Sequence, residues 1–163
     1  MNNNQTLDSK TTHCPCGTSL TYDQCCEPCH SGRAVAETPE RLMRSRYSAF
    51  VLAHFHYLIK THHVDYLQGV TEQQLAQGKM QWLGLEVLSS TQLSEYGEVT
   101  FKAWFIEDNQ LDAIYECSSF IKRDGHWLYT EGQQMQTRLP GRNDACICNS
   151  GKKFKQCCAK RLG

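Results

Sequence analysis

Eight of the ten cysteines in this chain fall into two groups that repeat one spacing. In each group a Cys-x-Cys pair is followed by eight residues and then by a Cys-Cys pair. The groups are Cys14, Cys16, Cys25 and Cys26, and Cys146, Cys148, Cys157 and Cys158. Four thiolates complete the tetrahedral coordination that zinc prefers in structural sites. The spacing therefore predicts two zinc sites, with iron as the alternative metal because thiolates also hold iron.

The eight residues inside each group must turn the chain back so that the two pairs meet. Gly17 in the first group, and Asn149 and Gly151 in the second, tolerate the positive φ angles of such a turn. One aromatic residue in each group, Tyr22 or Phe154, is expected to cover its site. A segment this short buries too little apolar surface to fold alone, and structural zinc contributes about 10–16 kcal/mol in comparable peptides.

An even number of cysteines also permits a disulfide framework. Residues 1–12 are polar and lack the apolar segment of an export signal, so we expect a cytoplasmic protein with reduced thiols and a disordered N-terminus. Adjacent cysteines are poor disulfide partners for each other and fit a shared metal better. The pattern thus favours metal, and His13, Cys29 and His30, which flank the first group, are interpreted as spare residues rather than ligands.

Charge is distributed unevenly although the whole chain is neutral. Residues 138–163 carry seven basic and one acidic side chain, a formal +6, whereas residues 38–137 carry a formal −4. Lys152, Lys153 and Lys155 lie inside the second cysteine group. They could offset the charge of about −2 of a four-thiolate zinc site, or they could bind an acidic partner such as ribosomal RNA, anionic lipid or a negative protein surface. No apolar run approaches the roughly 18 residues of a membrane span.

The middle of the chain changes from helical to strand periodicity at Trp82. Thr38-Pro39-Glu40 is a strong helix start, and further helices are predicted over His54–His63 and Thr71–Gln77. Four strands are predicted: Trp82–Leu88, Glu98–Ile106, Leu111–Lys122 and His126–Glu131, the last two joined by a hairpin at Asp124-Gly125. Helices followed by an antiparallel meander indicate an α+β fold. Its core, from Leu42 to Tyr129, is expected to be independent of both cysteine groups.

Arg46 falls on the apolar face of the first helix, with Tyr47 at the edge of that face. A buried arginine must pair or reach solvent, so Arg46 either forms a salt bridge or lines a pocket for an anionic ligand. Arg46, Tyr47 and Glu116 are the candidate pocket residues, with His54 and Glu86 as further candidates. No catalytic motif is present in the sequence, so a non-enzymatic role is favoured while an enzyme that uses the central pocket stays open as an alternative. Cys117 is expected to be a buried small hydrophobic residue.

Asn143–Cys158 resembles the SEC-C motif, the metal-binding tail of the preprotein translocase SecA, which runs N-x-P-C-x-C-G-S-G-K-K-Y-K-x-C-C/H. Here Ala145, Asn149 and Phe154 replace its proline, glycine and tyrosine. From about residue 13 onward the chain resembles the YchJ family of small bacterial proteins. Thr38–Phe50 carries much of that resemblance, and Glu116 and Phe120 match a further family pattern.

This resemblance implies three parts, which we name here. They are a SEC-C-like N-terminal module at 13–30, a nuclear-transport-factor-2-like cone of helices on a curved antiparallel sheet at 38–137, and a SEC-C C-terminal module at 138–163. It also implies a partner near protein export, such as an export chaperone, the translocase or the ribosome.

Three functions remain open from the sequence. The first is a zinc-binding interaction protein that uses Lys152, Lys153 and Lys155. The second is a small-molecule-binding protein or enzyme that uses the central pocket, and the third is an RNA-binding protein that uses the basic tail.

Overall fold

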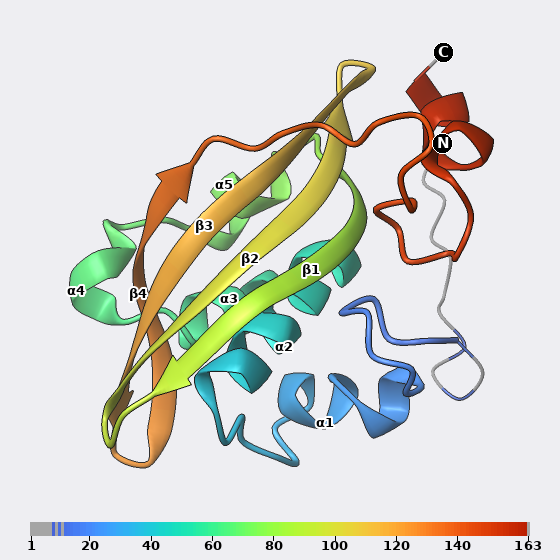
Figure 1. The fold of residues 1–163 in the computed structure, drawn as a ribbon. Helices are drawn as coiled ribbons and strands as arrows, with labels where there is room; N and C mark the ends of the chain where they lie inside the picture. Colours follow the sequence, from blue (N-terminus) through green and yellow to red (C-terminus); the bar gives the residue numbers. More distant parts are fainter. Residues whose placement is uncertain (1–7, 9, 11, 163) are drawn as a thin grey trace.

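The computed structural model describes residues 8, 10 and 12–162, so the disorder predicted for residues 1–12 lies almost entirely outside the described residues. Four antiparallel strands form a strongly curved sheet in the order β1-β2-β3-β4 (Figure 1). The strands are β1 (Gln81–Gln92), β2 (Tyr96–Glu107), β3 (Gln110–Arg123) and β4 (His126–Met135). This confirms the α+β fold with helices on a curved antiparallel meander.

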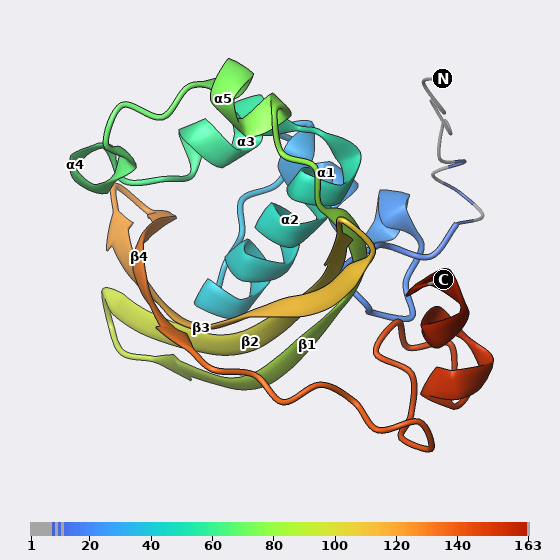
Figure 2. The same cartoon turned by 90° about the horizontal axis from the view of Figure 1, so that it is seen from above.

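The longest helix, α2, lies in the concavity of the sheet (Figure 2). Shorter helices line the open side of the concavity, and α1 belongs to the N-terminal module. The helices are α1 (Glu27–His30), α2 (Pro39–Leu52), α3 (Phe55–Lys60), α4 (Val64–Leu67) and α5 (Glu72–Ala76). None of the helices in the described part of the chain is long and apolar enough to cross a membrane.

Two helix starts follow the predicted capping chemistry. The Thr38 hydroxyl accepts a hydrogen bond from the backbone N–H of Arg41, and Thr71 forms a capping box with Gln74. The helix predicted over His54–His63 is shorter than expected: α3 ends at Lys60, and α4 begins only at Val64, beyond the predicted range. The backbone between the two helices pairs with β4, because Tyr129 N–H donates to the Thr61 carbonyl and His63 N–H donates to the Tyr129 carbonyl.

The hairpin predicted at Asp124-Gly125 is confirmed. Both residues have positive φ, 52° and 79°, as a tight two-residue hairpin turn requires. β1 and β4 each continue about four residues past their predicted ends, to Gln92 and Met135. These extensions are exposed and polar, so they are held by backbone pairing and carry no apolar pattern in the sequence.

The hydrophobic core lies between α2 and the concave face of the sheet, and it includes the N-terminal module. Cys16, Tyr22 and Cys26 belong to the same buried cluster as Leu42 and Phe120. The expectation of a core independent of both modules is therefore wrong for the N-terminal one. Its buried thiols and aromatic ring lie against the side of α2 and complete the core there.

The C-terminal module forms a separate small cluster beside β1. Cys146, Phe154 and Cys158 are buried together, with Leu83 and Leu111 of the sheet packed against them. The chain reaches this place from β4 by crossing the outer side of the sheet, so both modules lie on the same side of the molecule (Figure 2).

The C-terminal module approaches the backbone of β1 closely at a glycine. A Cβ atom at Gly84 would lie 2.4 Å from the carbonyl oxygen of Ile147, and the Asn149 amide donates to the Leu85 carbonyl at 3.4 Å. The same amide would lie 3.3 Å from a Cβ at Gly17. The two modules therefore meet each other at the edge strand β1.

We expect the two modules to contribute unequally to stability. A chain of residues 1–137 should keep cooperative thermal unfolding, because the C-terminal cluster is separate from the core. A chain of residues 31–163 should lose about 3 kcal/mol or more, a penalty typical of losing one large buried side chain. Thermal and urea unfolding followed by circular dichroism measures both. Greater instability of the 1–137 chain would contradict this view of the core.

Candidate metal centres

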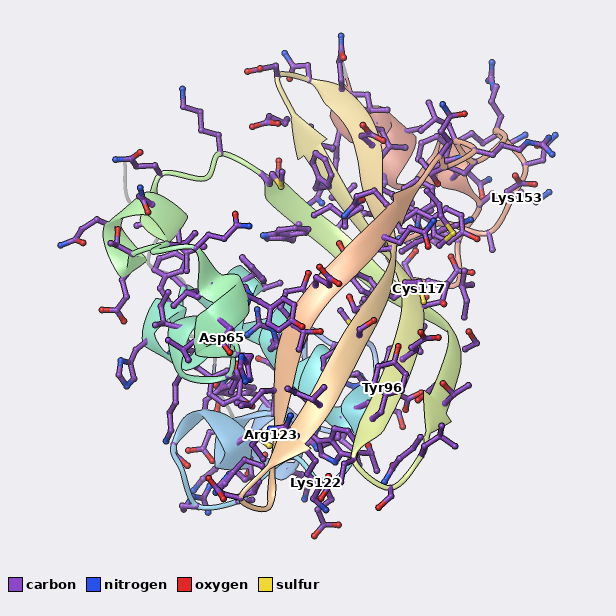
Figure 3. All side chains as sticks on the ribbon, turned by 90° about the vertical axis from the view of Figure 1, so that its left-hand side faces the viewer. Asp65, Tyr96, Cys117, Lys122, Arg123 and Lys153 are labelled. Carbon is purple, nitrogen blue, oxygen red and sulfur yellow. The ribbon has the colours of Figure 1, made fainter. Side chains whose placement is uncertain are left out.

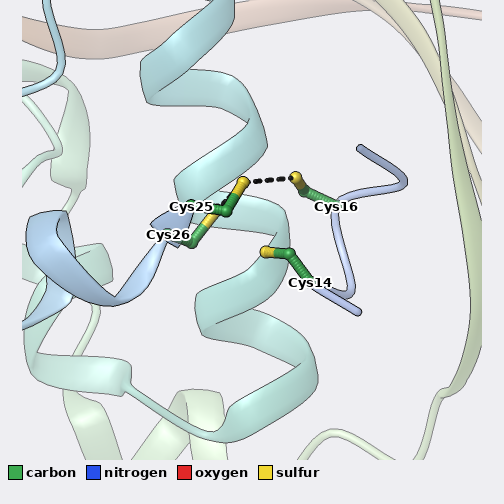
Figure 4. A group of neighbouring side chains, drawn as sticks. All are labelled: Cys14, Cys16, Cys25 and Cys26. Atoms are coloured by element: carbon green, nitrogen blue, oxygen red, sulfur yellow. Dashed lines mark hydrogen bonds between the residues drawn. The ribbon is translucent and has the colours of Figure 1, made fainter. Parts of the chain in front are cut away.

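The four sulfurs of the N-terminal module converge on one point beside α2. Figure 4 shows the side chains of Cys14, Cys16, Cys25 and Cys26 directed toward each other. Their Sγ atoms all lie within 4.8 Å of one another, with 3.5 Å between Cys16 and Cys25 and 3.9 Å between Cys25 and Cys26. Zinc–sulfur bonds of about 2.3 Å in a tetrahedron place sulfurs about 3.8 Å apart. The cluster therefore fits a closed four-sulfur metal site.

The C-terminal module has the same arrangement of sulfurs. The Cys148 Sγ lies 3.5 Å from both the Cys146 and the Cys157 Sγ, and Cys158 completes the group. All ten cysteines of the chain carry free thiols, in accord with a metal framework rather than a disulfide framework. Both clusters could thus hold a metal ion, which would be bound by four thiolates and leave no coordination position for a substrate.

The backbone around the two clusters is duplicated. Cys14 N–H donates to the Leu20 carbonyl at 2.9 Å, and Cys146 N–H donates to the Lys152 carbonyl at 2.8 Å. Each module then forms one short 3-10 helix immediately before its Cys-Cys pair. These helices are η1 (Tyr22–Gln24) and η2 (Phe154–Gln156). The aromatic residue that begins each helix is buried in its cluster, as expected of a cover for the site.

The turns between the cysteine pairs match as well. Gly17 and Asn149 both have positive φ, 88° and 63°, which confirms the predicted turn chemistry. A hydroxyl also contacts the third sulfur of each group. The Thr18 hydroxyl lies 3.1 Å from the Cys25 Sγ, and the Ser150 hydroxyl donates to the Cys157 Sγ at 3.3 Å. The two modules are therefore one structural unit used twice.

The environments of the two clusters differ in charge. One face of α2 presents Arg41, Arg44 and Ser48 to the N-terminal cluster. Arg41 Nη1 donates to the Cys25 Sγ at 3.5 Å, Arg44 donates to the Cys16 carbonyl at 2.7 Å, and the Ser48 hydroxyl lies 3.5 Å from the Cys14 Sγ. The guanidinium groups offset the negative charge of the thiolates. The sequence reasoning missed these three residues, although their spacing places them on one helical face.

Hydrogen bonds among the thiols of the N-terminal cluster shift their pKa values in opposite directions. The hydrogen bond from Cys14 lowers the pKa of Cys16 to about 6, and a hydrogen bond from Cys14 also lowers the pKa of Cys25. Hydrogen bonds with neighbouring thiols raise the pKa of Cys14 and of Cys26. A bound metal would replace these shared protons and hold all four sulfurs as thiolates.

The residues that flank the first cysteine group do not join its cluster of sulfur ligands. Cys29 is buried, and burial raises the pKa of its thiol. His30 receives a hydrogen bond from the Tyr22 hydroxyl at 2.6 Å and donates to the Ser45 carbonyl at 2.7 Å. It therefore fastens the module to α2, which agrees with the interpretation of these residues as spare to the metal.

The candidate pocket residues Arg46, Tyr47 and Glu116 do come together. They line a cavity between α2 and the concave face of the sheet. Two further candidates do not: His54 lies 3.3 Å from the Tyr22 hydroxyl outside that cavity, and Glu86 is exposed on β1.

Two expectations about single residues are corrected. Arg46 is buried and forms no ion pair with any described residue, so the expected salt bridge or reach to solvent is wrong. The reason is that carbonyl and hydroxyl acceptors on α3 and just after it take its hydrogen bonds. Cys117 is half-buried rather than buried, because its strand turns it to the outer face of the sheet, away from the helices (Figure 3).

Comparisons with known proteins agree with this architecture. Residues 38–132 match the family described as "YchJ, middle NTF2-like domain", and residues 142–160 match the SEC-C motif. A UPF0225 protein from Shewanella sp. (strain MR-4) is 54% identical over 158 residues, which cover 91% of this chain and 96% of that protein. A UPF0225 protein from Vibrio parahaemolyticus is 42% identical over 162 residues, which cover 89% and 97%.

Two solved structures are similar over most of the chain. The crystal structure of a SEC-C motif containing protein from Psychrobacter arcticus has a TM-score of 0.68 and 32% identity, and the match covers 93% of this chain and 98% of that one. The solution structure of a SEC-C motif containing protein from Rhodopseudomonas palustris has a TM-score of 0.71 and 32% identity, with 77% and 100% covered. With its nuclear-transport-factor-2-like middle domain, its SEC-C motif and relatives at this level of identity, the chain belongs to the YchJ family of UPF0225 proteins.

Proposed function

We propose that this protein is a cytoplasmic zinc-binding interaction protein. Both four-cysteine clusters hold structural zinc, and the C-terminal module binds an acidic surface of a protein partner. The observation that carries the proposal is a set of exposed lysines on the C-terminal module, which lies outside the core. Lys152, Lys153 and Lys155 are all exposed, and none forms an ion pair with another described residue.

Comparison of the two modules supports a role for these lysines beyond the metal site. The duplicated backbone aligns Lys152, Lys153 and Lys155 with Leu20, Thr21 and Asp23 of the N-terminal module. The same scaffold therefore forms without any lysine at these positions. Of the two modules, the C-terminal one alone has lysines at these aligned positions, so the need to fold the module does not account for them.

The lysines also make no contact that would neutralise the sulfurs. In the N-terminal cluster Arg41 donates directly to the Cys25 and Cys26 sulfurs. In the C-terminal cluster the protein donor outside the thiols is the Ser150 hydroxyl, and among the described residues no lysine side chain donates to sulfur. Of the two readings of the lysines, the acidic partner is therefore the better supported.

A protein partner fits this module better than RNA. Single-stranded nucleic acid is usually bound by basic groups together with exposed aromatic rings that stack on bases. The aromatic residue among these lysines, Phe154, is buried under the sulfurs. The similarity of the module to the translocase tail points to an export chaperone, the translocase or the ribosome as the partner.

Zinc should leave the two clusters at different rates when a chelator is added. Cys148 and Cys157 are half-buried, whereas all four N-terminal cysteines are buried, so the chelator reaches the C-terminal zinc first. Freshly purified protein should contain about two zinc ions per chain by ligand count. A chromogenic chelator should release the C-terminal ion in a fast phase and the N-terminal ion in a slower phase.

The double variant Cys157→Ser, Cys158→Ser identifies the phases. It should lose the fast phase and keep the slow phase together with the circular dichroism spectrum of the core. A fast phase that survives in this variant would assign the labile metal to the N-terminal cluster. Protein that contains iron, or no metal with paired disulfides in the mass spectrum, would contradict zinc.

Charge reversal on the C-terminal module should weaken partner binding. The triple variant Lys152→Glu, Lys153→Glu, Lys155→Glu places negative charge against an acidic partner, and we expect at least about tenfold weaker binding, or about 1.4 kcal/mol. The loss should be largest at low salt, where screening is least. Capture from native lysate, with captured proteins identified by mass spectrometry and titrated in purified form, measures the effect.

The matched control is Lys60→Glu, Lys79→Glu, Arg123→Glu. It changes the net charge equally at exposed positions outside the C-terminal module. This control should bind as the unaltered protein does. Equal loss in both triple variants would indicate unspecific charge attraction, and capture that disappears after nuclease treatment would assign the lysines to RNA instead.

A further inference from the structure

A cavity of about 160 Å³ lies between α2 and the concave face of the sheet, away from both metal clusters. Half of its lining residues are aromatic, with Phe50, Trp82, Phe101 and Phe120 among them. Phe50 and Trp82 are only half-buried, so the cavity is open on their side. An apolar cavity of about 150 Å³ is large enough for one benzene ring.

The polar part of the wall contains an arginine that is only partly satisfied. Arg46 is 8% exposed, and its Nη1 atom donates to the Leu58 carbonyl at 2.8 Å and to the Thr61 hydroxyl at 2.7 Å. These two bonds use both hydrogens of Nη1. The opposite edge of the guanidinium, formed by Nε and Nη2, has no hydrogen-bond partner among the described residues. Two parallel N–H groups on that edge match the two oxygens of a carboxylate.

The charge of Arg46 is not neutralised by its surroundings. Glu116 is the acidic residue in the same wall, but its carboxylate already accepts hydrogen bonds from Ser118, Tyr129 and Gln134. It does not come within ion-pair distance of Arg46. The Arg46 Cζ lies 4.8 Å from the centre of the Tyr129 ring, and this cation–π contact is favourable in a buried site but supplies neither an anion nor an acceptor for Nε and Nη2.

Arg46 nevertheless remains charged at neutral pH. Burial lowers the pKa of its guanidinium to about 10, well above 7. A buried cation without an anion is costly, and a bound anion removes that cost. The cavity is therefore better suited to a ligand with one negative group than to a neutral one.

A further donor lies in the same wall. Tyr47 is 4% exposed, and its hydroxyl has no hydrogen-bond partner among the described residues. Burial raises the pKa of Tyr47, so the hydroxyl keeps its proton and can donate. The Tyr47 hydroxyl is not among the buried side-chain atoms of the described residues that lack a partner, so its oxygen reaches accessible space and can donate to a ligand group in this cavity.

We propose that this cavity binds a small aromatic monocarboxylate. The carboxylate pairs with the Nε and Nη2 edge of Arg46, and the ring lies among Trp82, Phe101 and their aromatic neighbours. A phosphate ester suits the site less, because one arginine faces its double charge and the Glu116 carboxylate lies in the same wall. The site is separate from the C-terminal module, so this proposal does not depend on the proposed partner binding.

Matched pairs of probes test the proposal on the full, metal-loaded chain. Benzoate and phenylacetate should bind, and their amides, benzamide and phenylacetamide, should bind at least about tenfold more weakly because they lack the charge. Calorimetry gives the affinities, and NMR should show the largest shift at the Trp82 indole. No binding of either acid at about 10 mM, which is an affinity below about 3 kcal/mol, would overturn the proposal. Equal binding of acids and amides would overturn the role of Arg46.

Two variants assign the site. Arg46→Lys keeps the positive charge but removes the paired N–H donors of Nε and Nη2. It should weaken benzoate binding about tenfold. Ala103→Leu fills the cavity without touching the guanidinium, and it should abolish binding. Circular dichroism checks that each variant is folded. Unchanged affinity in either folded variant would place benzoate elsewhere and overturn the proposal, and if one variant does not fold, the other decides.

Discussion

Helix α2 is held between the N-terminal sulfur cluster on one side and the concave face of the sheet on the other (Figure 2). Arg41, Arg44 and Ser48 direct their polar groups at the cluster, while the next positions around the helix face the sheet. One helix therefore joins the metal-binding segment to the core. A metal bound by these sulfurs would also fix the surface against which α2 packs, and its binding would then be coupled to folding of the middle of the chain.

The two modules show one small scaffold placed in two different environments. Both keep the four sulfurs, the positive-φ turn, the hydroxyl at the third sulfur and the buried aromatic ring. They differ in what surrounds them. The N-terminal copy is enclosed by α2 and belongs to the core, whereas the C-terminal copy packs on the sheet through Leu83 and Leu111 and keeps a lysine-rich surface in solvent. Burial suits a structural role, and exposure leaves a charged surface for recognition.

The sequence predicted what depends on near neighbours along the chain. The cysteine clusters, the Thr38 and Thr71 helix starts and the Asp124-Gly125 turn are all set by residues a few positions apart. The C-terminal module also matches the model of a known motif, whereas its N-terminal counterpart was predicted from the repeated spacing and the family resemblance.

What the sequence could not predict depends on distant pairing. The split between α3 and α4 arises because backbone groups near Thr61 bond to β4, about seventy residues away. The polar ends of β1 and β4 are strands only because their neighbours hold them. The contact of Arg41 with the sulfurs needed the position of α2 relative to the N-terminal module, which no local pattern contains.

The three arginines of α2 differ in whether contacts within the fold account for their charge. Arg41 faces thiolates and a carbonyl, and Arg44 faces a carbonyl and lies 3.6 Å from Glu40, so folding accounts for both charges. Arg46 is the most enclosed of the three, yet it has two carbonyl or hydroxyl acceptors and no anion. A core built for stability alone would gain by replacing such a residue with an apolar one of similar size. The place of Arg46 in the wall of the cavity is therefore the feature of α2 that folding alone does not explain, and it is the observation from which the proposed ligand site follows.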